Sequence, residues 1–185
     1  VTGRVGFYGK ADQGRAWLLL NTLNVQLEDV EVCADFGATL IDEARATKDA
    51  SEAERIRQMG RQTCTIVERT LDFLRGHEVG DEMLLQADGT PLTIGRVHHE
   101  ISRFIAEEQL EDPEGFIFSI GRDAGVPHSR GRAEDVVALG KSIVFDIFPR
   151  EAGGGYFFDM TRTFCLGYAP SEVADAHQDV KECVE

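Results

Sequence analysis

Two aspartates, Asp146 and Asp159, each lie inside a strongly apolar run of residues that predicts a β-strand. The runs are 142–148 and 156–164, and the Pro- and Gly-rich segment 149–155 between them predicts a turn. In a hairpin centred on that turn, the two carboxylates face each other with Cβ atoms roughly 5 Å apart. Such a pair either shares a proton or binds a divalent cation, for which carboxylate oxygens are suitable ligands. The alternative is a register slip that turns one aspartate toward solvent.

Other side chains near this predicted hairpin are weaker candidates for a site. His128 follows the tight turn predicted for 125–127, and a loop histidine can reach a site built on strand ends. Taken alone, such a histidine is more often an ordinary surface residue. Thr161 and Thr163 share the strand face of Asp159, where a hydroxyl could orient the carboxylate. The alternative is the ordinary preference of threonine for strands.

Composition limits the classes of partner. The chain has 185 residues, is 42% hydrophobic and carries 33 acidic against 19 basic residues, a formal charge of −14. This charge argues against nucleic acid or an anionic membrane as the main partner. No apolar stretch approaches the roughly 20 residues of a membrane span, and the N-terminus does not read as a signal peptide. Four well-separated cysteines give no metal or redox motif, which favours reduced thiols in a cytoplasmic protein.

The elements that would position these residues fall into two parts. Residues 1–46 read β-α-β-α, and we interpret them as the C-terminal portion of an α/β domain. Residues 47–185 read helix, helix, strand, loop, strand pair and helix, which predicts an α+β domain with an antiparallel sheet covered by helices. A capping box at Ser51 and Glu54 begins the first helix, and Leu92-Thr93 begins the second. The start without Met and the stop within a helical pattern indicate a fragment of a longer protein.

The segments 140–146 and 155–164, the latter containing Asp-Met-Thr-Arg-Thr, resemble the pita-bread metallopeptidases. That family includes Xaa-Pro aminopeptidases, prolidases and methionine aminopeptidases, with creatinase as a relative. Pro127-His128 resembles the upstream histidine loop of the family, and 45–48 followed by Glu52 resembles the start of its catalytic domain. The resemblance covers residues 45–185 and implies the first half of a pita-bread catalytic domain. The preceding α/β part points to the Xaa-Pro aminopeptidase, prolidase and creatinase branch.

This resemblance implies roles for the candidate residues. Asp159 would bridge two divalent metal ions, Asp146 would chelate one, and Thr161 would support a carboxylate. His128 would hydrogen-bond the substrate while a metal-activated hydroxide attacks the peptide bond before proline. Manganese is the favoured metal, with cobalt, zinc or iron as alternatives. The implied substrate is a small peptide with proline at its second position, and the family habit suggests a homodimer.

Two departures from the family pattern stand out. The aspartates are 13 residues apart, somewhat more than in the usual family hairpin, and the extra length lies at the turn. The remaining family ligands, one histidine and two glutamates, are expected beyond this chain, so we expect the 185-residue chain alone to bind metal weakly and to be inactive. Three alternatives stay open: a creatinase-like C–N hydrolase, a non-catalytic pita-bread module that binds peptides or proteins, and an α+β domain with a chance acidic hairpin.

Overall fold

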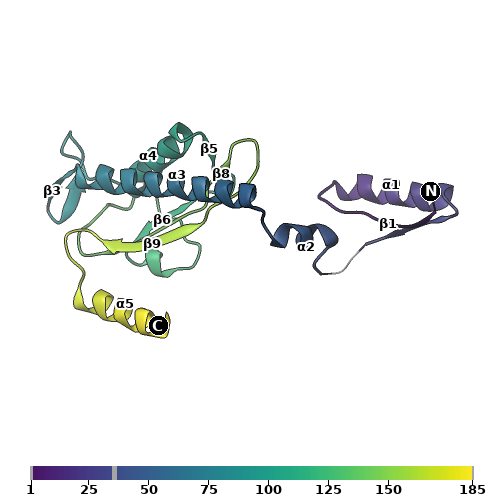
Figure 1. Ribbon diagram of the computed structural model, residues 1–185. Coiled ribbons are helices and arrows are strands. Elements are labelled where there is room, and N and C mark those ends of the chain that lie inside the picture. The colour runs from purple at the N-terminus through teal and green to yellow at the C-terminus, as the bar shows by residue number, and fades with distance from the viewer. Residues whose placement is uncertain (1, 35–36, 185) are drawn as a thin grey trace. The chain divides into compact units, whose positions relative to one another are not determined.

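The computed structural model describes residues 2–34 and 37–184, in two compact units, Val1–Glu52 and Ala53–Glu185 (Figure 1). Residues 1, 35, 36 and 185, which the sequence-based domains include, lie outside the described residues. The boundary expected between residues 46 and 47 stays a prediction. None of the helices in the described ranges is long and apolar enough to cross a lipid bilayer.

The first unit has the expected order of elements. Strand β1 (Gly3–Gly6) pairs in parallel with β2 (Val30–Cys33), and helix α1 (Gln13–Gln26) connects them. Asp12 caps α1 by accepting a hydrogen bond from the Arg15 amide at 3.0 Å, as expected from its place before the helical pattern. The short helix α2 (Leu40–Ala46) follows, capped by Thr39. A parallel pair joined by a helix is a β-α-β unit, so this part has α/β character.

Two helices support the second unit. Helix α3 (Ala50–Arg75) buries one face, and α4 (Ile94–Glu107) buries its apolar stripe with Thr93 as N-cap. The cap of α3 differs from the sequence-based expectation. Asp49 accepts hydrogen bonds from the amides of Ser51 and Glu52, while Glu52 accepts from the Asp49 amide at 2.8 Å. The capping box therefore begins two residues before Ser51, because an Asp-x-x-Glu sequence offers the same reciprocal bonds.

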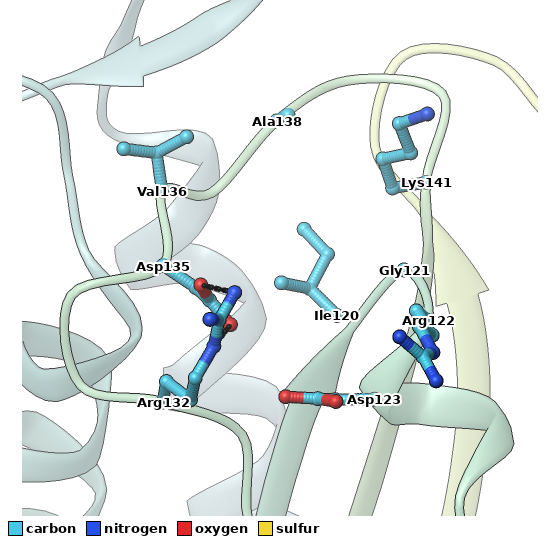
Figure 2. A pocket seen from close by; sticks show the side chains of 9 residues that line it. All are labelled: Ile120, Gly121, Arg122, Asp123, Arg132, Asp135, Val136, Ala138 and Lys141. Atoms are coloured by element: carbon cyan, nitrogen blue, oxygen red, sulfur yellow. Dashed lines mark hydrogen bonds and ion pairs between the residues drawn. The ribbon is translucent and has the colours of Figure 1, made fainter.

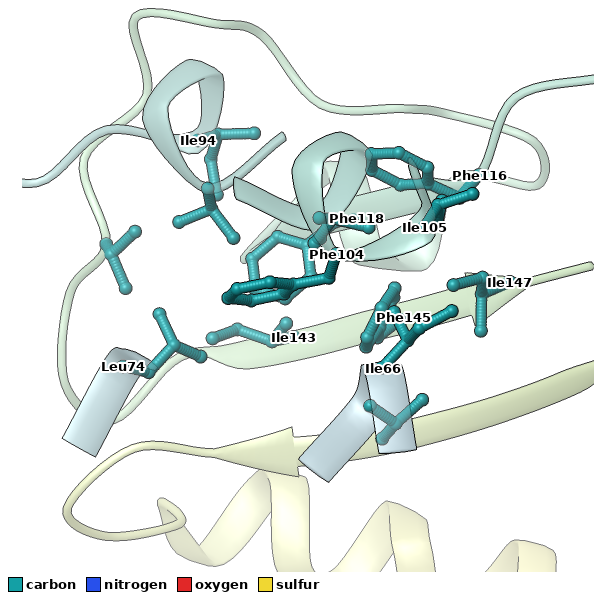
Figure 3. Close-up of a cluster of buried hydrophobic side chains, with 14 of the residues drawn as sticks. Ile66, Leu74, Ile94, Phe104, Ile105, Phe116, Phe118, Ile143, Phe145 and Ile147 are labelled. Carbon is teal, nitrogen blue, oxygen red and sulfur yellow. The ribbon is translucent and has the colours of Figure 1, made fainter. Parts of the chain in front are cut away.

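A three-stranded antiparallel sheet carries the candidate residues. Its order is β6 (Ile117–Ile120), β7 (Ser142–Ile147) and β9 (Met160–Cys165). Side chains alternate between the faces of a sheet, so one set of residues from these strands meets the helices. Five strand residues of that set are buried in the core together with residues of the helices: Phe118, Ile120, Ile143, Phe145 and Ile147. Figure 3 shows Phe118, Ile143, Phe145 and Ile147 beside Ile66 and Leu74 of α3 and Phe104 of α4.

Smaller elements complete the unit, and the sequence pattern did not predict most of them. Strands β3 (Glu78–Gly80) and β4 (Met83–Leu85) form a hairpin, and β5 (Leu110–Glu111) pairs with β8 (Arg150–Glu151). A 3-10 turn, η1 (Asp123–Gly125), follows β6, and helix α5 (Ser171–Val184) follows β9. At two or three residues each, β3, β4, β5 and β8 are too short to show a two-residue period in sequence.

Candidate metal centre

The face of the sheet that points away from α3 and α4 is polar. Asp146 of β7 lies directly opposite Thr161 of β9, and the next pair on this face is Val144 and Thr163. Asp159 precedes β9 by one residue and is two residues from Thr161, so alternation places it on this face too. The fold therefore brings Asp146, Asp159 and Thr161 together on one side of the hairpin.

The register of the hairpin differs from the expected one. Asp146 pairs with Thr161 rather than with Asp159, and the turn is centred between Gly153 and Gly154. Both glycines have left-handed backbones, with φ of 79° and 92°, which side chains adopt only at a cost. The chain turns at these glycines because they adopt left-handed conformations with the least strain. As a result, the residue opposite Asp146 is Thr161, two positions beyond Asp159. Because two is the period of a strand, both aspartates stay on one face and become diagonal neighbours.

The two carboxylates interact electrostatically. Partial burial, the negative charge of Asp146 and a hydrogen bond shared with Asp146 together raise the pKa of the Asp159 carboxyl above its ordinary value. The Thr161 hydroxyl donates a hydrogen bond to Oδ1 of Asp146 at 2.7 Å. It therefore orients Asp146, whereas the sequence had suggested Asp159 as its partner. Two adjoining carboxylates that resist joint ionisation suit a divalent cation, which removes the repulsion and takes hard oxygen ligands.

His128 lies in the loop after η1, on the surface. The Ser129 amide donates to the Val126 carbonyl at 3.1 Å and closes a turn in which Pro127 and His128 are the central residues. His128 has φ of 62°, a position at which such turns usually have glycine. A histidine held in this conformation is a reason to suspect a function. Within the described residues, no hydrogen bond or ion pair joins His128 to either aspartate.

The hairpin that carries Asp159 is tied to the rest of the unit at two points. Arg55 of α3 donates Nε to Oε1 of Glu151 at 3.0 Å. Glu111 of β5 accepts from Nη2 of Arg150 at 2.9 Å and from the Gly153 amide at 2.8 Å. The hairpin tip is therefore fixed to both α3 and β5, which limits the freedom of the neighbouring carboxylate.

These tethers were missed by sequence reasoning, as was the hydroxyl of Ser119. Arg55 and Glu151 are 96 residues apart, and no local pattern marks them as partners. Ser119 of β6 lies on the polar face of the sheet, 1% exposed, and its hydroxyl has no hydrogen-bond partner among residues 2–34 and 37–184. The backbone of Gly131 lies close to this strand, because a Cβ position there is only 3.3 Å from the Cα of Ser119.

The described part of the chain supplies only part of a metal site. No group of three or more His, Cys, Asp or Glu side chains among residues 2–34 and 37–184 is placed to hold a metal ion. Asp146 and Asp159 are thus two candidate ligands without a third one beside them in the described ranges. A metal ion of four to six ligands needs other donors, from water, substrate or other protein groups.

Comparison with known proteins gives a consistent family relationship. A sequence model of metallopeptidase family M24 matches residues 54–185, which include both aspartates, His128 and Thr161. No curated protein matches the chain's sequence significantly.

Several solved structures have a similar fold. An X-Pro aminopeptidase from Thermotoga maritima MSB8 aligns with TM-score 0.64 and 21% identity, covering 89% of this chain and 42% of that one. The prolidase from Pyrococcus horikoshii OT3 aligns with TM-score 0.70 and 16% identity, covering 97% and 45%. An X-prolyl aminopeptidase from Caenorhabditis elegans, described as a cytosolic enzyme with a di-nuclear active site, aligns with TM-score 0.57 and 20% identity, covering 80% and 23%. The chain spans less than half the length of each, and at these identities the likeness shows the pita-bread fold alone.

Proposed function

The chain belongs to metallopeptidase family M24, and from that premise we propose that the whole protein is a metal-dependent exopeptidase cleaving the peptide bond before proline. The observation that carries the proposal is the placement of Asp146 and Asp159 as diagonal neighbours on the polar face of the sheet, within the part of the chain that matches the family. The X-Pro aminopeptidase and prolidases among the similar structures support proline as the second residue of the substrate. Aminopeptidase and dipeptidase activity are both compatible with this site.

Each candidate residue has a task in this proposal. Asp146 and Asp159 would hold two divalent ions, and Asp159 would contribute to the binding of both. Thr161 keeps the Asp146 carboxylate in one orientation through its 2.7 Å hydrogen bond. When bound, the metal pair supplies Lewis acidity and activates water for hydrolysis. His128, presented by its strained turn, donates a hydrogen bond to the substrate carbonyl, where negative charge develops.

Manganese is the metal we favour, because the known donors are carboxylate oxygens. Cobalt, zinc or iron fit equally if histidine completes the ligand set. Two metal ions agree with the di-nuclear site named for the C. elegans neighbour. The acidic composition and separated cysteines favour a cytoplasmic location, and a small peptide is the only partner proposed besides a second copy of the protein.

An alternative function is a pita-bread module that binds peptides or proteins without catalysis. The observation in its favour is the lack of a third metal-ligating side chain beside the aspartates in the described ranges. A creatinase-like C–N hydrolase, which needs no metal, is less well supported. The adjoining carboxylates would then have no cation to offset their repulsion.

An assay of the whole protein distinguishes these functions. We expect Ala-Pro and longer Ala-Pro peptides to be hydrolysed when Mn²⁺ is added, with loss of activity in the presence of EDTA. Asp159→Asn should remove activity by a thousandfold or so while the protein stays folded, since a metal centre contributes several kcal/mol to the barrier. Full activity of Asp159→Asn, or activity insensitive to EDTA, would contradict the proposal. Peptide binding without hydrolysis would favour the non-catalytic module.

A further inference from the structure

A cavity of about 420 Å³, whose lining is drawn in Figure 2, lies where β6 ends and β7 begins. Ile120 ends β6 and Lys141 precedes β7, whereas Asp146 lies five residues further along β7. At about 3.3 Å per strand residue, Lys141 is on the order of 16 Å from Asp146 along the strand. The cavity is therefore separate from the candidate metal centre.

Main-chain hydrogen bonds hold the two walls of the cavity in place. One wall contains Gly121, whose amide donates to the Ser142 carbonyl of β7 at 2.8 Å. The opposite wall contains Asp135, whose carbonyl accepts from the Ile94 amide at the start of α4 at 2.8 Å. A space between walls fixed in this way is preorganised for a ligand.

The charges in the cavity are unevenly distributed. Arg132 donates Nη2 to Oδ1 of Asp135 at 2.8 Å, so this cation already has a partner on its own wall. Figure 2 shows Asp123 pointing its carboxylate into the space between the walls, and its charge, after that of Asp135, contributes to raising the pKa of Arg132. On the other wall, Arg122 and Lys141 have no carboxylate partner among residues 2–34 and 37–184.

Two features of this lining identify the class of ligand. Three cations against two carboxylates leave one net positive charge, in a chain with 33 acidic and 19 basic residues. Ile120, Val136 and Ala138 supply apolar surface between the charged walls. A ligand with one negative charge and a short hydrocarbon part matches both features, whereas a phosphate dianion would be repelled by Asp123 and Asp135.

We propose that this cavity binds a small aliphatic monocarboxylate, with its charge attracted to the wall that carries Arg122 and Lys141 and its hydrocarbon against Ile120, Val136 and Ala138. Arginine and lysine make charge-assisted hydrogen bonds to a carboxylate, which are the stronger kind. The ligand comes from one of two sources, a short-chain carboxylic acid or the carboxylate end of a free amino acid. In the second case the ammonium group lies near Asp123. This site does not depend on the peptidase function.

The test is an NMR titration of the ¹⁵N,¹³C-methyl-labelled chain with isovalerate, leucine and inorganic phosphate. We expect saturable shifts at Gly121, Val136 and Ala138 with isovalerate, and about tenfold weaker binding in both Arg122→Gln and Lys141→Gln. Arg57→Gln is the matched control, because Arg57 is an exposed cation of α3 far along the chain from the cavity, and its loss should leave the affinity unchanged.

Asp123→Asn separates the two sources of ligand. Removal of this negative charge should tighten isovalerate binding, and weaker leucine binding in the same variant identifies a free amino acid as the ligand. Equal tightening of both identifies a plain carboxylic acid. The proposal is overturned by any of three results: no saturable shift with either compound, the same affinity in an Arg122→Gln, Lys141→Gln double variant, or phosphate binding at least as tight as isovalerate.

Discussion

The two faces of the sheet formed by β6, β7 and β9 are made by alternate residues of the same strands, yet they differ in almost every respect. The helix-covered face places Phe118, Ile143 and Phe145 at 0 to 1% exposure in a continuous core. The other face carries two neighbouring like charges, the half-buried Asp146 and the exposed Asp159, and a buried hydroxyl without a hydrogen-bond partner in the described ranges. One face is arranged for stability, and the other bears features that cost stability and suit metal binding.

The largest expected difference between the faces is in folding. Phe118→Ala should lower the free energy of unfolding by about 3–5 kcal/mol, because it removes a fully buried ring and leaves a cavity. Asp146→Asn, on the opposite face, should change it by less than about 0.5 kcal/mol or raise it, since the variant removes like-charge repulsion. Urea denaturation of the two variants checks this pair. A large loss of stability in Asp146→Asn would mean that the polar face also carries the fold.

The next effect distinguishes two threonines of one strand. Thr161→Val removes the hydroxyl that orients Asp146 and should weaken metal affinity by about 10- to 100-fold. Thr163→Val is the control, because Thr163 lies on the same face opposite Val144 and should have little effect. Isothermal titration with Mn²⁺ measures both. Equal losses in the two variants would reduce Thr161 to an ordinary strand residue.

These residues also separate what the sequence could predict from what it could not. Helix faces, the antiparallel sheet and the shared face of the two aspartates followed from periodicity, which depends on local residues alone. The direct pairing of Asp146 with Asp159 was wrong, because turn geometry at Gly153 and Gly154 sets the register. The partners of Glu111 and Glu151 and the cavity beside Arg122 depend on long-range packing, for which one sequence has no local signal.

A smaller effect is expected at Ser119. Its buried hydroxyl lacks a partner, so Ser119→Ala should raise the free energy of unfolding by about 1 kcal/mol. Phe118→Ala at the adjacent residue supplies the contrast, since it faces the core. Thermal unfolding followed by circular dichroism is sufficient. Destabilisation by Ser119→Ala would show that the hydroxyl has a partner such as a bound water molecule.

The smallest effect concerns the hairpin tip. The hydrogen bond from the Gly153 amide, followed by that from Arg150, lowers the pKa of the Glu111 carboxyl below its ordinary value of 4.5. The contribution of the ionised Glu111 carboxylate to the stability of the hairpin tip is present above pH 4.5. It is lost as the pH falls through the lowered pKa, where Glu111 takes up a proton. The protection of the Gly153 amide against exchange, taken relative to the intrinsic rate at each pH, should therefore fall in acid, and Glu111→Gln should show lower protection already at pH 7. Exchange independent of Glu111 would remove this tether from the account.

The proposed metal centre requires that the polar face of the sheet bind a divalent ion through Asp146 and Asp159. The most direct measurement is paramagnetic broadening of the amide signals of the chain by substoichiometric Mn²⁺, which locates even a weak site. We expect selective broadening at Asp146, Asp159 and Thr161 that disappears in Asp159→Asn. Broadening spread over the acidic surface, or unchanged in an Asp146→Asn, Asp159→Asn double variant, would contradict it.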